Sequence, residues 1–513
     1  MSILTLKFFL FLAITVVTYY LCVPKLRWVV ILVANIGFFI SATGIATLIV
    51  FTTMVLATWG ASLLLKSIKS EKIKKAVTAG AILVLLITLI LYKELSFFLI
   101  NAKLLGSFVR LSFDFALPDW VAPLGISYYT LILIGYLLDV RWGTIAEPQK
   151  NPFKFITFSG YFPHMTSGPF TRYNDVKDTL FGEVKFHPST QWRGFQRILW
   201  GLFKVIVIST RLSVLVETIY HAQTLPMSEN HFTGIAVLIG AMLYILYIYM
   251  NFSGSMDIVI GASELFGIPL AENFQRPFSA TNLSELWRRW HMTLGFWLKD
   301  YVLYPTLKSG WMNKIRSFCK THLGKKASKD IPTYIGMFIS WFCVGFWHGG
   351  LWKYIFGSGL FFFIMIVGGL ILHPFFKKII KICRINTECY SWRGFQRVRT
   401  FLLFVLAVSF GRAASFHDGF SMWHNLFIDS NIGVLFDGTI FNMGLTGGDL
   451  FIALMGLVVV FFVSHLQQKH GDIRTLLTKQ NILFQISIVV VLFALVFLIG
   501  GMDNSVDLMY GKF

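Results

Sequence analysis

The sequence predicts an all-α, polytopic transmembrane helical bundle. Of its 513 residues, 56% are hydrophobic and 14% are charged, whereas about a quarter of the residues in a typical soluble protein are charged. The mean hydropathy is +0.67. Apolar stretches that reach, with their flanks, the roughly 20 residues needed to cross a bilayer recur along the chain, with cores at 29–40, 76–91, 235–250, 360–372 and 482–499. We therefore expect one integral membrane domain rather than several soluble domains.

The first apolar stretch, from Ile3 to Cys22, is expected to be a retained membrane span. It has neither the basic start nor the small-residue cleavage site that is typical of a signal peptide. The five cysteines of the chain follow no common zinc-binding spacing. We therefore expect no metal site and interpret the thiols as structural.

The chain is strongly basic, with a formal net charge of +20. On a membrane protein such a charge is typical of cytoplasmic loops that face anionic lipid headgroups. The sequence has no recognisable RNA- or DNA-binding motif. Membrane lipids, and not nucleic acid, are therefore the expected partners.

Lysine and arginine gather in three clusters, at 66–75, 308–329 and 377–399. Because cytoplasmic loops are enriched in these cations, we place all three clusters inside and the N-terminus outside. After the N-terminal spans, which end at the outer side, this path predicts further spans at 122–140, 198–217, 231–250, 333–347, 354–375, 400–411, 450–465 and 482–500.

Three segments are too polar to span and too apolar for open loops, at 153–170, 252–270 and 284–304. Irregular or half-crossing backbone at membrane depth is tolerated where it is buried in protein or lines a cavity. We therefore expect these segments to build the functional site. The hexapeptide "WRGFQR" occurs at 192–197 and again at 392–397, in each case just before a predicted span, and we interpret both copies as interfacial anchors.

The third polar segment predicts an amphipathic helix that carries a histidine at the edge of its apolar stripe. Asn282 followed by Glu285 has the form of a capping box at a helix start. The stripe has the i, i+3, i+4, i+7 spacing of a helix and consists of Leu283, Leu286, Trp287, Trp290, Leu294, Trp297, Leu298 and Tyr301. Two interpretations stay open for His291: an interfacial helix at the inner leaflet with no special task for the imidazole, or a neutral imidazole used in function.

A second histidine, His348, lies near the end of an apolar stretch, between Trp347 and the pair Gly349 and Gly350. Ionisable residues in membrane segments are costly and indicate function by default, and a neutral histidine can act as a general base. The alternative is a histidine at the outer interface that bonds to a carbonyl group. A third histidine, His164 in "YFPHMTSGPFTRY", is interpreted as structural.

Several motifs occur in an order that resembles a known family. They are "APLGISYYTLILIGYLLDV" (122–140), "YFPHMTSGPFTRY" (161–173), "NFSGSMDIVIGASELFGIPLAENFQRPF" (251–278), "LWRRWHMTLGFWLKDYVLYP" (286–305), "GFWHGG" (345–350) and "FGRAASF" (410–416). Together they resemble the membrane-bound O-acyltransferase (MBOAT) family, in the bacterial branch of the alginate O-acetylation protein and the D-alanyl-teichoic acid transferase.

The resemblance implies a ring of transmembrane helices, with re-entrant and amphipathic helices around a thinned central tunnel. It implies catalytic roles for His348, as the base, and for His291. It also implies that substrate contacts line the tunnel, for which we expect Trp287, Arg288, Arg289, Trp290, Trp297, Asp300, Asn273, Asp257 and Trp347. Three regions follow from it: N-terminal transmembrane helices at 1–120, a catalytic core at 121–416, and a C-terminal extracytoplasmic loop with the final helices at 417–513.

The function that the resemblance implies is transfer of an acyl group, with acetyl favoured, from a cytoplasmic donor to hydroxyls of a cell-surface polysaccharide. The expected donor is acyl-CoA or the phosphopantetheine thioester of an acyl carrier protein, with no bound cofactor. An extracytoplasmic accessory acyltransferase is an expected partner, and the bacterial cell membrane the expected location. The alternative reaction is D-alanyl transfer to teichoic acid. Two hypotheses of a different class stay open: a transporter with a histidine proton relay and a bis-histidine haem protein.

Overall fold

The computed structural model describes residues 2–108, 110, 120, 122–225, 232–428, 430 and 432–500, and this part of the chain is helical, without β-strands. The longer helices are α1 (Leu6–Leu21), α2 (Arg27–Thr43), α3 (Ile45–Ser67), α4 (Glu71–Leu89), α5 (Leu95–Phe108), α6 (Ile126–Trp142), α10 (Pro188–Leu202), α11 (Thr210–Ala222), α12 (Ile235–Leu265), α16 (Gly310–His322), α17 (Gly324–Trp347), α19 (Phe361–Ile371), α21 (Tyr390–Arg412), α22 (Phe416–Ile428), α23 (Gly447–His470) and α25 (Ile482–Ala494). The shorter ones are α7 (Pro152–Ser159), α8 (Phe162–Met165), α9 (Tyr173–Leu180), α13 (Leu283–Trp287), α14 (Met292–Leu298), α15 (Tyr304–Lys308), α18 (Trp352–Tyr354), α20 (His373–Ile382) and α24 (Ile473–Leu477).

Nine helical segments of the described chain are long and apolar enough to cross a membrane. They are Pro24–Thr43, Ile45–Ser67, Glu71–Phe108, Pro188–Ala222, Ile235–Leu265, Trp352–Ile371, Tyr390–Arg412, Gly447–His470 and Ile482–Ile499. The predicted first span contains α1, which has 16 residues and is shorter than these nine segments. The all-α, multi-pass prediction is confirmed.

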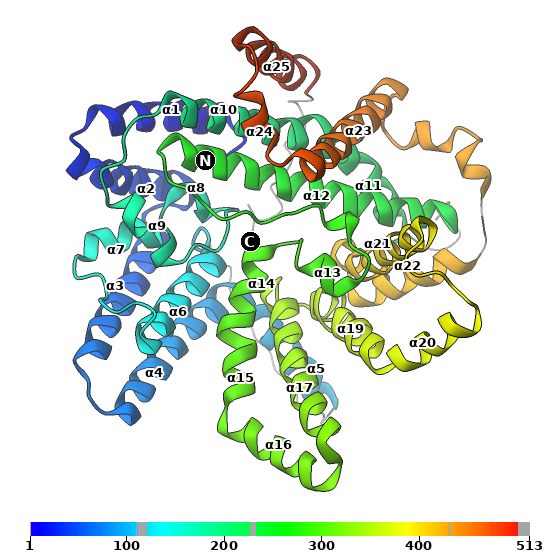
Figure 1. Ribbon diagram of the computed structural model, residues 1–513, viewed down its shortest axis with the longest axis horizontal. Coiled ribbons are helices and arrows are strands. Elements are labelled where there is room, and N and C mark those ends of the chain that lie inside the picture. The colour runs from blue at the N-terminus through cyan, green and yellow to red at the C-terminus, as the bar shows by residue number, and fades with distance from the viewer. Residues whose placement is uncertain are drawn as a thin grey trace.

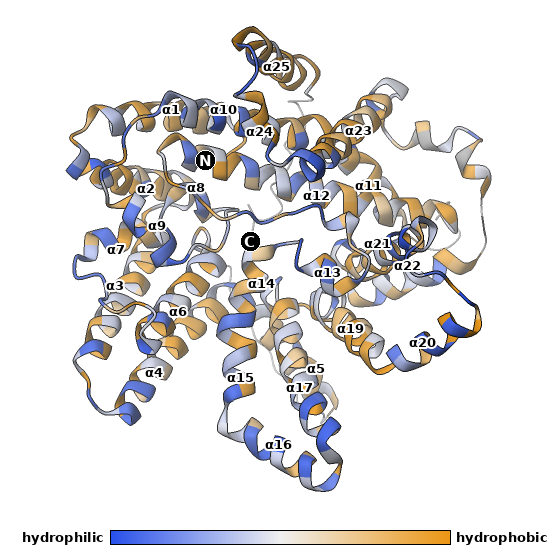
Figure 2. Ribbon diagram, in the orientation of Figure 1, coloured by the Kyte–Doolittle hydropathy of each residue, from blue (hydrophilic) through white to orange (hydrophobic). Residues whose placement is uncertain are grey.

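The helices surround a central region that holds α13, α14 and the irregular segment before them (Figure 1). Figure 2 shows hydrophilic residues along that central segment and on the α16–α17 hairpin, whereas α1, α3, α23 and α25 are largely hydrophobic. A polar centre inside a ring of apolar helices is the arrangement in which irregular backbone is tolerated at membrane depth.

Ion pairs between helix ends agree with the predicted alternation of sides. At one side, Lys66 at the end of α3 pairs with Glu147 after α6 at 3.0 Å, and Arg193 in α10 pairs with Asp472 after α23 at 2.8 Å. All of these ends are predicted to be cytoplasmic. Which side faces the cytoplasm stays a prediction.

Two predicted segments have a different structure. Residues 252–265 are not a separate polar element but continue α12, and the predicted basic loop at 308–329 consists of α15, α16 and the start of α17. The glycine and polar residues of this part of α12 pack against α10. A Cβ atom on Gly254 would lie 2.8 Å from the carbonyl oxygen of Gly201, and Asp257 pairs with Arg197 at 2.9 Å. The polar residues of α12 therefore face a neighbouring helix and not lipid.

The prediction of one continuous helix at 284–301 is also wrong, because the helix is interrupted at His291. Its backbone is left-handed, with φ +48°, and separates α13 from α14. The break follows from pairing with the segment before α13, because Met292 N–H donates to the Asn273 carbonyl at 3.0 Å. The predicted start is confirmed, since the Asn282 side chain accepts from the Glu285 N–H at 2.9 Å.

Candidate active site

His348 lies at the sharp turn that follows α17. Gly349 and Gly350 have φ values of +141° and +57°, which L side chains rarely adopt. A Cβ atom on Gly350 would lie 1.7 Å from Oε2 of Glu94, so glycine is required there for space as well as for conformation. The turn leaves His348 half-buried at the edge of a small cavity.

A lysine from the N-terminal part of the chain reaches the same turn. Lys93 lies in the π-helical stretch between α4 and α5, and its Nζ donates to Ser127 Oγ at 2.9 Å and to the Trp347 carbonyl at 3.0 Å. It therefore anchors the residue next to His348. Lys93 is not among the residues predicted from the sequence, although a lysine in an otherwise apolar stretch is the signal that marks functional residues in membrane helices.

The cavity beside His348 is enclosed by residues of four segments. Its volume is about 10 Å³, close to the room that a single water molecule needs. The lining residues are Lys93, Gly125, Ser127, Tyr128, Thr166, Trp347 and His348. A neutral base and a cation thus face one confined space.

His291 is 2% exposed and is held between aromatic rings. Its ring centroid lies 4.9 Å from that of Phe252, 5.9 Å from that of Phe170 and 6.0 Å from that of Trp347. Burial lowers its pKa, and the neighbouring His348 lowers it further. Burial also lowers the pKa of His348, with a smaller effect from Lys93. Both imidazoles are therefore neutral near physiological pH and can accept a proton.

Asn273 fixes the ring of His291 and the start of α14. Its Oδ1 accepts from the Thr293 N–H at 3.0 Å and from the Thr293 hydroxyl at 2.9 Å, and lies 3.3 Å from His291 Nδ1. The paired segments at 273–275 and 289–292 thus act as one rigid unit. Asn273 is a positioning residue for His291.

A second, larger cavity of about 260 Å³ lies beside the ring of Phe170. Phe170 lines it and stacks on Tyr128, a residue of the small cavity, with centroids 4.3 Å apart. The larger cavity is lined by Ile132, Gly135, Tyr136, Asp139, Phe170, Thr171, Arg172, Tyr173, Asp175, Ala271, Thr293, Phe296, Trp297, Lys299, Asp300 and Tyr301. The rings of Phe170, His291 and Trp347, which we call the aromatic layer, contact one another, and Phe170 lines the larger cavity whereas Trp347 lines the small one.

The larger cavity carries a polar network with two cations. Arg172 pairs with Asp300 at 2.5 Å, and the Tyr301 hydroxyl donates to Asp139 at 2.8 Å. Lys299 also lines this space. The lining thus holds two cations beside the three carboxylates of Asp139, Asp175 and Asp300, so this space is polar and of mixed charge.

The other predicted site residues have separate positions. Trp297 and Asp300 both line the larger cavity. Trp297 also donates to the Leu131 carbonyl at 2.9 Å. Trp290 is buried against Phe274, and Trp287 packs on Trp341. Three further residues line neither cavity: Arg288 is exposed, Arg289 pairs with Glu285, and Asp257 pairs with Arg197 and Lys204.

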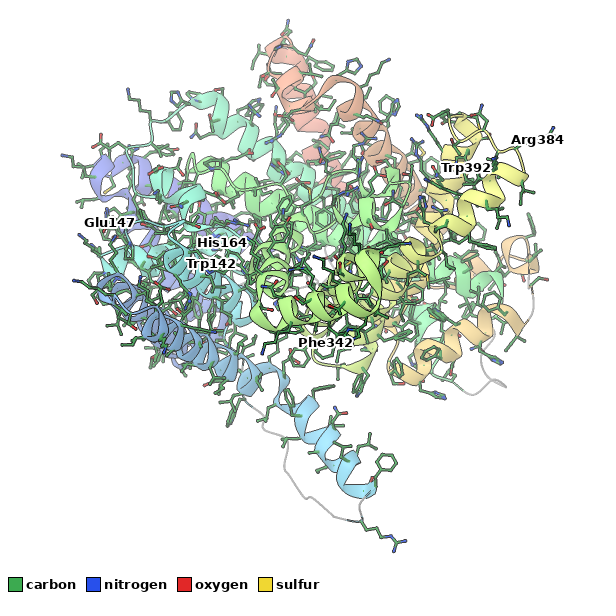
Figure 3. The ribbon with its side chains drawn as sticks, turned by 60° about the horizontal axis from the view of Figure 1, so that its bottom comes forward. Trp142, Glu147, His164, Phe342, Arg384 and Trp392 are labelled. Atoms are coloured by element: carbon green, nitrogen blue, oxygen red, sulfur yellow. The ribbon has the colours of Figure 1, made fainter. Side chains whose placement is uncertain are left out.

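Two other features lie outside this constellation. His164, labelled in Figure 3, is 1% exposed and packs edge-on against Tyr161, at 5.4 Å between ring centroids. Within the described part of the chain, no group of three or more His, Cys, Asp or Glu side chains could hold a metal ion. The chemistry that the site can perform is proton transfer at His348 next to a fixed positive charge.

Comparison with known proteins connects this geometry to a family. The sequence profile of the membrane-bound O-acyltransferase family matches residues 146–410. The chain is 30% identical over 314 residues to a probable alginate O-acetylase of Pseudomonas syringae pv. tomato, which covers 61% of this chain and 53% of the relative. It is 28% identical to a teichoic acid D-alanyltransferase of Bacillus subtilis, over 56% of this chain and 67% of the relative.

A third relative is a peptidoglycan O-acetyltransferase of Helicobacter pylori, at 25% identity over 52% of this chain and 50% of the relative. The chain spans about half the length of the alginate O-acetylases that it matches. The profile match extends from before α7 to α21 and includes both histidines of the site.

Proposed function

Because the chain belongs to the membrane-bound O-acyltransferase family, we propose that it transfers an acyl group from a cytoplasmic thioester donor to a hydroxyl of a cell-surface polysaccharide. The observation that carries the proposal is His348, a neutral base that shares a confined cavity with Lys93 next to the aromatic layer. The bacterial cell membrane is the proposed location. The proposed acyl transfer is supported by relatives that are named as an alginate O-acetylase, a teichoic acid D-alanyltransferase and a peptidoglycan O-acetyltransferase.

The proposed reaction is a direct acyl transfer. The His348 imidazole accepts the proton of the acceptor hydroxyl while that oxygen forms a bond to the thioester carbonyl carbon. The carbon–sulfur bond then breaks, and the leaving thiolate takes the proton from the imidazolium, so that an ester and a free thiol result. The Lys93 ammonium, fixed by Ser127 and the Trp347 carbonyl, stabilises the negative charge that develops on the carbonyl oxygen.

The larger cavity is the proposed donor side. Its lining is polar and, beside three carboxylates, includes Arg172 and Lys299, whose charges suit the phosphate of a phosphopantetheine arm, which acyl-CoA and acyl carrier proteins share. The thioester would then reach the layer of Phe170, His291 and Trp347 from this side. The acceptor hydroxyl would reach His348 from the opposite side, where an accessory acyltransferase is a proposed partner.

An acetyl group is favoured over a D-alanyl group on electrostatic grounds. A D-alanyl thioester carries an ammonium group next to the reacting carbonyl, and like charges in a confined space repel each other. In this chain the Lys93 ammonium lines the cavity beside His348. A neutral acetyl group avoids that repulsion.

We expect Asn273→Ala to lower the turnover number about tenfold, because small displacements of a reacting geometry are costly. The variant loses the oxygen that fixes Thr293 and His291, whereas His348 is untouched. Turnover and thermal unfolding of the purified chain check this, with the exposed Asn313→Ala on α16 as the matched control. Equal turnover of both variants would contradict the positioning role.

We expect a cysteine at Lys314, in α16, to react with an impermeant maleimide only after the cells are opened. The basic hairpin is placed in the cytoplasm because of its charge. The control is a cysteine at Phe436, which is 83% exposed on the predicted outer side. Both are made in a chain whose native cysteines are replaced by serine, and labelling of position 314 in intact cells would invert the topology.

The proposed function is tested by mass analysis of the surface polysaccharides from cells with and without this chain. We expect ester-linked acetyl groups that depend on the chain. Chain-dependent D-alanyl esters would replace the acetyl proposal by the alternative, and identical polymers in both strains would contradict the proposed acyl transfer.

A further inference from the structure

The two copies of "WRGFQR" have opposite surroundings, although they share six residues. In the first copy, within α10, Trp192 Nε1 donates to Gln485 Oε1 at 3.1 Å. Arg197, its last residue, is 6% exposed and pairs with Asp257, Glu264 and Glu272 at 2.9, 3.4 and 2.6 Å. The end of the first copy is therefore part of a buried helix contact, and its position at the membrane interface stays a prediction.

In the second copy, at the start of α21, the same polar groups have no such partners. The Nε atom of Arg397 and the Nε1 atom of Trp392 are buried and make no hydrogen bond with the described residues. A Cβ atom on Gly394 would meet nothing within 4 Å, whereas one on Gly194 would lie 2.8 Å from the Gly261 carbonyl oxygen. Figure 3 shows Trp392 at the end of the molecule that also carries Arg384. A buried guanidinium nitrogen without an acceptor is costly.

Arg397 faces other arginines instead of carboxylates. The segments that carry these arginines are in contact, because the Gln275 N–H donates to the Arg289 carbonyl at 2.9 Å and Arg399 of α21 donates to the Thr281 carbonyl at 3.0 Å. In agreement with this, burial lowers the pKa of Arg276, and the charges of Arg289 and Arg397 lower it further. Arg276 comes from the segment before α13, Arg289 from the end of α13 and Arg397 from α21. We call these three residues the arginine cluster.

The one carboxylate in contact with the arginine cluster, among the described residues, has other partners as well. Glu285 accepts from Arg289 at 2.7 Å and from the Thr281 N–H and hydroxyl, both at 2.9 Å. The other side-chain hydrogen bonds of the cluster, among the described residues, go to neutral groups: Arg276 donates to Gln468, and Arg289 donates to Ser279 at 3.2 Å. The cluster therefore keeps an excess of positive charge.

We propose that the arginine cluster is a phosphate-binding site at the cytoplasmic membrane interface. Planar guanidinium groups bind phosphate oxygens by paired hydrogen bonds, and a phosphate would supply the acceptors that Arg397 lacks and remove the mutual repulsion. The three residues line neither cavity of the active site. The proposal therefore does not depend on the proposed acyl transfer.

The phosphate has two chemical sources, a phospholipid headgroup and a soluble phosphate ester. The membrane-facing surroundings are compatible with a lipid, because Phe395 and Tyr390 of the same helix start are 53% and 84% exposed, as is usual for aromatic residues at an interface. The phosphate groups of a soluble ester such as CoA would be bound by the same guanidinium groups. The experiment therefore tests a lipid and a soluble ester separately.

The test measures binding of phosphatidylglycerol, by native mass spectrometry, and of CoA, by calorimetry, to the purified full chain. We expect at least one probe to bind about tenfold more weakly to Arg397→Gln and to Arg276→Gln, because each loses a charge-assisted hydrogen bond. The matched control is Arg393→Gln, which removes the same charge from the same helix but from a residue paired with Glu388 at 2.7 Å. This control should bind like the wild type.

The outcome also separates the sources and checks the folding. An effect on phosphatidylglycerol alone assigns the site to lipid, and an effect on CoA alone assigns it to a soluble ester. Without either probe, Arg397→Gln should unfold at the same temperature as the wild type or higher, because the repulsion is relieved. Equal binding of both probes by all variants, or no binding to the wild type, would overturn the phosphate site; if Arg397→Gln does not fold, Arg276→Gln decides.

Discussion

His348→Ala is expected to lower acyl transfer roughly 10²- to 10⁴-fold, the range that a general base contributes. The imidazole lines a small cavity beside Lys93 and Trp347, and alanine has no group that could accept the hydroxyl proton. Because the change removes a half-buried side chain at the end of α17, we expect insertion and thermal stability to be kept. Transfer rates in purified membranes, normalised to the amount of folded protein, measure the effect.

The matched control is His373→Ala, which removes an exposed histidine at the start of α20. It should transfer acyl groups at the rate of the unchanged chain. If His348→Ala keeps full activity while His373→Ala behaves as expected, the assignment of the base is wrong.

Gly350→Ala is expected to have the second-largest effect, about a 10²-fold loss of activity, since a displacement near 1 Å at a reacting group costs that much. The new methyl group would overlap the Glu94 carboxylate, at 1.7 Å from Oε2, in a backbone conformation that alanine rarely adopts. Either Glu94 or the His348 turn has to move. Lys93, which contacts Glu94 at 3.8 Å and the Trp347 carbonyl, would be displaced with it.

Gly368→Ala in α19 is the control for this change. A Cβ atom there would meet nothing within 4 Å, and the backbone is not left-handed. Activity and thermal unfolding are measured for both variants, so that the same substitution is compared in the tight turn and on an open helix surface. Equal activity of the two variants would show that the geometry of the His348 turn is not required.

The sequence predicts the membrane class and the long apolar helices because their signals are local. Length and hydrophobicity of a segment determine whether it can span, and most of the predicted spans coincide with helices of the structure. The polar part of α12 was misread, because the residues that accept its polarity, such as Arg197 and Gly201, belong to another helix. The break at His291 was missed for the same reason, since the pairing partner Asn273 lies outside the helical pattern.

Within the candidate site, the two histidines and their neighbours Trp347 and Asn273 can be found from motifs, and the structure brings all four to one aromatic layer. Lys93 could not be placed, because its contact with Trp347 joins residues that are 254 positions apart in the sequence. Arg288 has the type of residue expected in a tunnel but is exposed. Residue type and spacing therefore indicate the proposed base, whereas its surroundings depend on long-range packing.

Acyl transfer across a sealed membrane tests the two-sided site most directly. Inverted membrane vesicles, with the cytoplasmic face outward, receive isotope-labelled acetyl-CoA outside and contain the acceptor polysaccharide inside. We expect labelled ester on the enclosed polymer with the unchanged chain and none above background with His348→Ala. Undiminished transfer by His348→Ala, or labelling only when donor and acceptor are on the same side, would contradict a path between the two cavities with His348 as the base.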